Sequence, residues 1–131
     1  MAKINWIGEL GWNEEQLEDL RLAGFAYVRQ GKYDIALPIF EALTVLDKEN
    51  AYDAQTLGAI YLQMNNPLKA LVYLDRALKL ETDHGPTLIN LSKALIMIGK
   101  KNEGLKLAQI LQHEPDARIA NMAKALMLAF G

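Results

Sequence analysis

Histidines are the side chains of this sequence best suited to acid–base chemistry or metal binding, and there are two of them. His84 follows Asp83, and His113 precedes Glu114. An imidazole titrates near neutral pH, so beside a carboxylate it could transfer a proton or ligate a metal ion. The two histidines are 29 residues apart (113 − 84), and neither has a second ligand at a metal-binding spacing. We therefore expect a surface or helix-capping role for both.

Other signals of chemistry are weak as well. The sequence has no cysteine, which excludes a disulfide framework, a cysteine-based zinc site and a thiol nucleophile. It has no phosphate-binding loop, no paired catalytic carboxylates and no nucleophile elbow. Lys100, Lys101 and Lys106 form a small basic patch that fits helix-end charge and solubility. The sequence predicts no enzyme, no catalytic residue, no metal and no cofactor.

Composition narrows the class of protein further. The 131 residues predict one domain, 1–131, with a sizeable core. A net charge of −2 gives no general attraction to nucleic acid. Although 51% of the residues are hydrophobic, no apolar run approaches the ~18 residues of a membrane span, so no membrane insertion is expected. The N-terminal residues lack the pattern of a secretion signal, and we expect a cytoplasmic protein.

A repeat with a period of 34 residues organises the elements that carry these side chains. Small, aromatic and bulky residues recur in the same order at this offset, and apolar spacings of three and four replace any strand-like alternation. Such a period is typical of stacked helical hairpins. The aligned columns are Gly24, Gly58 and Ser92; Tyr27, Tyr61 and Leu95; Ala36, Ala70 and Gly104; Phe40, Leu74 and Ala108; and Leu43, Ala77 and Leu111.

Capping signals divide the repeats into helices. Asn13 and Gln16 fit a reciprocal N-terminal cap, and Gly31 fits the left-handed position after a helix end. Pro67 follows an asparagine as a first-turn proline. Pro38 conflicts with the pattern, because a proline inside a helix costs about 3 kcal/mol, so we expect the helix to begin late, near Ile35, or to kink. The expected helices are 14–30, 33–46, 51–64, 67–80, 86–98, 101–112 and 115–129.

The columns resemble the tetratricopeptide repeat, whose antiparallel helix pairs stack into a curved superhelix. The repeats would cover 17–50, 51–84 and 85–118, with the third the most divergent. The resemblance implies an all-α fold of three helical hairpins in a right-handed superhelix, closed by a C-terminal capping helix at about 115–129.

Within that family, the central part of the chain resembles bacterial type III secretion chaperones. The matching residues are Phe40–Leu43, Leu46, Asp47, Leu57–Ala59 and Gln63. This motif is similar to chaperones of translocator subunits, whereas the length of the chain is closer to chaperones of needle subunits. Both classes remain open at this stage.

The resemblance also implies which residues face the concave surface, namely repeat positions 2, 5, 9, 12 and 13 of the first helix in each hairpin. Tyr52, Ile89 and Lys93 are the best candidates for partner contact. Phe25, Val28, Leu62 and Ile96 either line the groove or pack against neighbouring helices. The full set of candidate groove residues is Arg21, Phe25, Val28, Tyr52, Gln55, Ala59, Leu62, Ile89, Lys93, Ile96 and Met97.

A mostly apolar groove suits an amphipathic helix or an extended apolar segment. The resemblance therefore implies a chaperone that binds such a segment of a secreted needle or translocator subunit and prevents its premature assembly. The alternative is a scaffold or adaptor for proteins unrelated to secretion. Trp12 is expected to pack the first helix against the core; alternatively, Trp6 and Trp12 contact a second small co-chaperone or form a homodimer.

Overall fold

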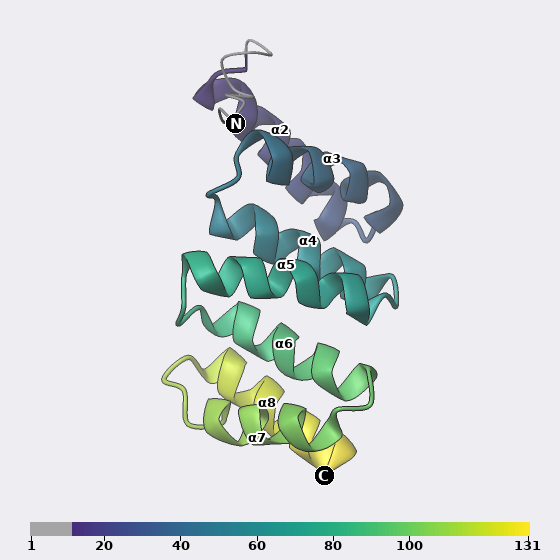
Figure 1. Ribbon diagram of the computed structural model, residues 1–131, viewed down its shortest axis with the longest axis vertical. Coiled ribbons are helices and arrows are strands. Elements are labelled where there is room, and N and C mark those ends of the chain that lie inside the picture. Colours follow the sequence, from purple (N-terminus) through teal and green to yellow (C-terminus); the bar gives the residue numbers. More distant parts are fainter. Residues whose placement is uncertain (1–11) are drawn as a thin grey trace, which may run out of the picture.

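The computed structural model describes residues 12–131, and these residues form seven helices (Figure 1). Three hairpins follow one another along the long axis of the molecule, and α8 packs on α7 and α6 at the C-terminal end. The all-α prediction is confirmed, while the right-handed sense of the superhelix stays a prediction. The helices are α2 (Glu14–Arg29), α3 (Tyr33–Leu46), α4 (Ala51–Gln63), α5 (Pro67–Leu80), α6 (Gly85–Met97), α7 (Lys101–Leu111) and α8 (Ala117–Phe130).

Backbone geometry repeats with the same 34-residue period as the sequence. Gly31, Asn65 and Gly99 each follow the first helix of a hairpin and have positive φ angles of 73°, 58° and 92°. A residue in this left-handed conformation ends a helix and turns the chain back, which is why glycine or asparagine occupies all three positions. At the start of α2, the Asn13 side chain accepts from the amide of Gln16 at 2.8 Å, and the Gln16 side chain accepts from the amide of Asn13 at 3.0 Å. The predicted reciprocal cap is confirmed.

Small residues allow the two helices of each hairpin to approach closely. A Cβ atom placed on Gly58 would lie 2.8 Å from Leu74 Cγ, and one on Gly24 would lie 2.7 Å from Phe40 Cε2. In the third hairpin the glycine has moved to the second helix. Ser92 replaces the glycine of the first helix and donates a hydrogen bond to the carbonyl of Gly104 at 2.7 Å. The divergent third repeat therefore keeps the close approach with a different pair of residues.

The expected span 33–46 is confirmed, whereas the late start proposed for Pro38 and the expected start of the last helix at 115 are wrong. α3 begins at Tyr33, where Lys32 O accepts from the amide of Ala36 at 3.0 Å, so the late start near Ile35 is not found and Pro38 is the sixth helical residue. α8 begins at Ala117, because the Asp116 side chain accepts from the amide of Arg118 and serves as the cap. Pro115 therefore precedes the cap and does not open the helix.

The buried apolar residues fall into two clusters. The N-terminal core is formed by α2, α3, α4 and α5 together with Ala94 of α6, and Trp12 packs against it, as predicted. The C-terminal core lies between α6, α7 and α8 and consists of Ile89, Ala108, Leu111, Ile119 and Ala123. Trp6, the other residue of the proposed N-terminal interface, lies outside the described residues. None of the helices from Glu14 onward is both long and apolar enough to cross a membrane.

Candidate peptide-binding groove

Two adjoining pockets lie between α2 and α4, the first helices of the first two hairpins. We call the first the Arg21 pocket; it has a volume of about 410 Å³ and is lined by Glu18, Arg21, Leu22, Phe25, Asn50 and Tyr52. We call the second the Ala59 pocket; it has a volume of about 220 Å³ and is lined by Phe25, Val28, Tyr33, Tyr52, Gln55, Thr56, Ala59, Ile60 and Gln63. Phe25 and Tyr52 line both pockets, which makes them the centre of one continuous groove.

An aromatic pair forms this centre. The ring centroids of Phe25 and Tyr52 are 6.5 Å apart with an interplanar angle of 57°, and the side chains are 37% and 40% exposed. The Arg29 guanidinium lies 5.5 Å from the centroid of the Phe25 ring, within the range of a cation–π contact. Burial raises the pKa of Tyr52, so its hydroxyl stays neutral at physiological pH. The groove thus offers a partner two large rings without a charge on either.

Arg21, which lines the Arg21 pocket together with Glu18, is the centre of an ion cluster. Its Nε and Nη2 donate to the two carboxylate oxygens of Asp53 at 2.7 and 2.8 Å, its Nη2 also donates to Asp47 at 3.0 Å, and its Nη1 donates to Glu18 at 2.7 Å. The hydrogen bond from Arg21 to Asp53 is the main reason why the pKa of Arg21 rises above its ordinary value. Burial raises the pKa of the Asp53 carboxyl, and Arg21 opposes that shift. The guanidinium is therefore occupied within the protein.

Local sequence explains how this cluster is held in place. Asp53 is fully buried in the first turn of α4, where its amide donates to the Asn50 side chain at 2.9 Å. Asn50 caps the helix and also donates to Asp47 at 3.3 Å. A carboxylate near a helix N-terminus is favoured by the helix dipole, which helps to keep Asp53 ionised against its burial.

Six of the predicted groove residues line the two pockets, namely Arg21, Phe25, Val28, Tyr52, Gln55 and Ala59. Val28 and Leu62 both pack against the N-terminal core, so for these two the packing alternative holds, with Val28 also at the pocket wall. The prediction missed Leu22, which is 58% exposed, and Tyr33, which comes from α3. Leu22 could have been found as an apolar residue next to Arg21. Tyr33 lies outside the first helices that the family pattern considers.

The α6 candidates lie elsewhere. Ile89 is only 1% exposed and belongs to the C-terminal core, so the expectation that it meets a partner is wrong. The reason is that α8 packs on α6 and covers this position. Ile96 is half-buried and lies against Gly104. Lys93 is also half-buried, and burial lowers its pKa. Met97 is 43% exposed. None of these four lines either pocket of the groove.

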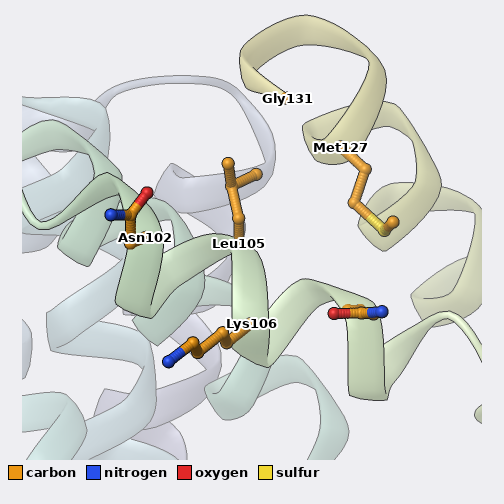
Figure 2. Close-up of a pocket in the computed structure, with 6 residues that line it drawn as sticks. Asn102, Leu105, Lys106, Met127 and Gly131 are labelled. Carbon is orange, nitrogen blue, oxygen red and sulfur yellow. The ribbon is translucent and has the colours of Figure 1, made fainter.

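A separate pocket lies between α7 and α8 at the C-terminal end (Figure 2). Its volume is also about 410 Å³, and its walls come from Asn102, Leu105, Lys106, Gln109, Met127 and Gly131. In Figure 2, Leu105 on α7 and Met127 on α8 stand on opposite sides of the space between the helices. This pocket has no aromatic ring and no carboxylate side chain, so it differs from the groove in both respects.

The two histidines have no catalytic partner in the described part of the chain. His84 occupies the N-cap position of α6, and its Nδ1 lies 2.8 Å from Thr87 Oγ1. His113 is exposed in the turn after α7. Between residues 12 and 131, no group of three or more histidine, aspartate or glutamate side chains is placed to hold a metal ion.

Several solved structures have a similar fold. PcrH of Pseudomonas aeruginosa, in complex with the chaperone binding region of PopD, is 24% identical over 90% of this chain and 92% of its own, with a TM-score of 0.78. The type III secretion translocator chaperone SycD of Yersinia enterocolitica is 20% identical over 98% and 99% of the two chains, with a TM-score of 0.79. SycD has also been solved with a peptide of the translocator YopD.

The same fold occurs in a protein with another kind of partner. The first tetratricopeptide-repeat domain of Spaghetti, bound to an HSP90 peptide, is 20% identical over 89% of this chain and 94% of its own, with a TM-score of 0.76. At these identities the likenesses establish the fold. Comparison with curated protein sequences gives no match.

Residues 11–109, well over half of the chain, match the family model described as anaphase-promoting complex, cyclosome, subunit 3. The match extends from the start of the first hairpin to Gln109, near the end of α7, and so covers the part of the chain that carries the 34-residue period. The match covers the helical repeats. The anaphase-promoting complex named in the description refers to other proteins of the family. The chain is thus a tetratricopeptide-repeat protein, and it belongs to the family described as anaphase-promoting complex, cyclosome, subunit 3.

Proposed function

We propose that this protein is a cytoplasmic, non-catalytic chaperone of type III secretion that holds an apolar segment of a translocator subunit in the groove between α2 and α4. The observation that carries the proposal is the exposed pair of Phe25 and Tyr52 at the junction of two pockets. The fold of PcrH and SycD, which were solved with segments of translocators, supports the translocator class over the needle class. Holding the segment would keep the subunit from assembling before export.

Magnitudes indicate what kind of segment the groove can hold. Covering the exposed parts of Phe25, Tyr52 and Leu22 would contribute about 2–4 kcal/mol, given ~1.5–3 kcal/mol for a whole side chain. Association alone costs an estimated 4–15 kcal/mol. A single inserted side chain is therefore insufficient, and the partner must fill both pockets with consecutive residues. An extended or helical apolar segment does so.

The charges of the groove argue against a partner that is held by its carboxylates. Arg21 already donates to three carboxylates of the protein, and Arg29 lies over the Phe25 ring. The groove therefore favours an internal apolar segment over an acidic chain end. The alternative function, a scaffold for proteins unrelated to secretion, draws support from the equally similar Spaghetti domain.

Purification of the tagged protein from its source cells, followed by native mass spectrometry, tests the proposal. We expect a stoichiometric complex with a translocator subunit. Tyr52→Asp should remove that subunit while the far-ultraviolet circular dichroism stays helical, because a carboxylate at the centre of the groove opposes apolar contact. Val72→Asp is the matched control, since Val72 is 63% exposed on α5 and lines neither pocket of the groove.

The outcomes separate the alternatives. Retention of the subunit by the Tyr52→Asp variant would contradict the groove assignment. Capture of a needle subunit in place of a translocator would correct the class. Capture of unrelated cytoplasmic proteins, lost on the same substitution, would establish the scaffold alternative.

A further inference from the structure

The pocket between α7 and α8 belongs to a longer groove (Figure 2). A second pocket, with a volume of about 300 Å³, is lined by Gln112, Lys124, Met127 and Leu128. Met127 lines both pockets, and we call the two together the C-terminal groove. Along α7 its lining extends from Asn102 to Gln112, a span of ten residues (112 − 102) or about 15 Å of helix. A helix of about three turns would cover this length.

The repeat shows which face of α8 lines this groove. In α4 and α6, the eighth residue of the helix faces the second helix of the same hairpin. A Cβ atom on Gly58 would lie 2.8 Å from Leu74 of α5, and Ser92 donates to the carbonyl of Gly104 on α7. The eighth residue of α8 is Lys124. Because α8 packs on α7 and α6 as α6 packs on α5 and α4, it stands as the first helix of a fourth hairpin.

Apolar side chains lie next to Lys124 on this face. Met127 is the eleventh residue of α8 and corresponds to Tyr61 of α4, whose ring stacks on Tyr73 of α5 with centroids 5.7 Å apart. Leu128 follows it and is 87% exposed. The last helix of a repeat stack needs a polar outer face if it is to meet only water. The exposed leucine therefore indicates a surface that a partner covers.

The charge of the C-terminal groove is positive. Lys106 lines one pocket and Lys124 lines the other, and no acidic side chain lines either. Within residues 12–131, neither lysine forms a salt bridge with a carboxylate. Even when the backbone carboxylate of the terminal residue, Gly131, is counted, one positive charge is in excess.

We propose that the C-terminal groove binds an amphipathic helix of another protein, one that carries glutamate or aspartate beside its apolar face. The bound helix takes the place of the second helix of the fourth hairpin. Its apolar residues cover Met127 and Leu128, and an acidic residue pairs with Lys124, where the earlier hairpins have a close contact at glycine or serine. This surface is separate from the groove between α2 and α4 and does not depend on what that groove binds.

Other occupants fit the C-terminal groove less well. A second copy of α8 would bring Arg118 and Lys124 and no acidic residue, so like charges would meet. A basic helix would be repelled for the same reason. A wholly apolar helix would remove water from the ammonium group of Lys124 without replacing its hydrogen bonds. Charge complementarity thus favours the acidic amphipathic helix.

Nuclear magnetic resonance titration of the ¹⁵N-labelled full chain provides the test. The probes are synthetic peptides of 14 residues, the length of α5, with leucines at helical spacing on one face and alanine and glutamine elsewhere. The glutamines next to the leucines are replaced by glutamate in a second peptide and by lysine in a third. Glutamine, glutamate and lysine have similar helix propensities, so the peptides differ chiefly in charge.

Two variants alter the C-terminal groove, and each has a matched control. Leu128→Ser removes the exposed leucine, and its control is Leu68→Ser, because Leu68 is 68% exposed on α5. Lys124→Gln removes the charge, and its control is Lys48→Gln, which alters an exposed lysine between α3 and α4. Neither control residue lines any of the pockets described above. All four side chains are exposed, so the variants should fold as the parent does.

We expect the glutamate peptide to shift amides of α7 and α8 around Gln109 and Met127. It should bind about 3–10-fold more tightly than the lysine peptide, with the glutamine peptide between them. Leu128→Ser should weaken binding of the glutamate peptide about 10-fold. Lys124→Gln should remove about 3-fold of the preference for glutamate, added salt should reduce it as well, and both controls should bind as the parent does.

Three results would overturn this assignment. The first is equal binding of the glutamate and lysine peptides, or binding that Leu128→Ser leaves unchanged. The second is a set of shifts confined to α2 and α4, which would leave the proposed function standing without a second surface. The third is a shift of the α8 amides with protein concentration alone, which would assign this face to a second copy of the chain.

Discussion

Arg21 on α2 and Ile89 on α6 occupy the same place in the first and third repeats, 68 residues apart (89 − 21), yet they form opposite kinds of contact. Arg21 reaches to the next first helix, α4, through charged hydrogen bonds to Asp53. Ile89 lies in an apolar core with Ile119 and Ala123 of α8. We call the contact between α2 and α4 the open seam, because two pockets lie along it, and the contact between α6 and α8 the closed seam, because a buried core fills it. The residue on the following helix decides whether a repeat position becomes a binding surface or a core.

Removing the cation of the open seam should have the largest effect on stability. In Arg21→Met, Asp53 is left fully buried without its partner, and we expect the free energy of unfolding to fall by about 3–5 kcal/mol in urea denaturation. Arg21→Met combined with Asp53→Leu should recover most of that loss, because the buried charge is removed as well. If the variant with Arg21→Met alone is as stable as the parent, the ion cluster does not stabilise the contact between α2 and α4.

Shortening the side chain of the closed seam should have the next largest effect. Ile89→Ala leaves a cavity in the C-terminal core, and we expect a loss of about 2–5 kcal/mol, against ~0.5–1.5 kcal/mol for Ile89→Val. Binding of a groove ligand should be unchanged in the Ile89→Val variant, which stays folded. Weaker binding by that variant at unchanged stability would show that Ile89 contacts the ligand, and would contradict the difference proposed between the two seams.

This contrast explains which features could be predicted from the sequence. Helix ends were predictable because they depend on local chemistry, as the Asn13 cap and the turn at Gly31 show. Phe25 and Tyr52 were predictable because the family pattern places them on the first helices. The burial of Ile89 depends on α8, whose packing no repeat column describes.

The partners of Arg21 were beyond sequence reasoning for a similar reason. Asp53 lies 32 residues away and Asp47 lies 26 residues away, in the segment that joins two hairpins. A single sequence contains no sign that these carboxylates converge on one guanidinium. Arg21 was therefore predicted as a groove residue, and its ion pairs with Asp47 and Asp53 were missed.

Lys93 allows the smallest and most specific test, since it corresponds by repeat position to the exposed Phe25 but lies half-buried on α6. Burial lowers its pKa below the ordinary value of 10.5, so between the folded and unfolded pKa values the unfolded chain binds more protons. Stability contributed by this group must therefore rise with pH across a window that ends near 10.5.

Lys93→Met isolates this contribution. The change in packing shifts the free energy of unfolding by the same amount at every pH, so only the charge of Lys93 makes the difference from the parent depend on pH. We expect the variant's advantage over the parent in urea denaturation to be largest at neutral pH and to shrink as pH approaches 10.5. A difference that stays constant with pH would mean that the Lys93 ammonium is as well solvated as in the unfolded chain. In that case α6 would share the open surface of α2 and α4, and the groove would extend along all three hairpins.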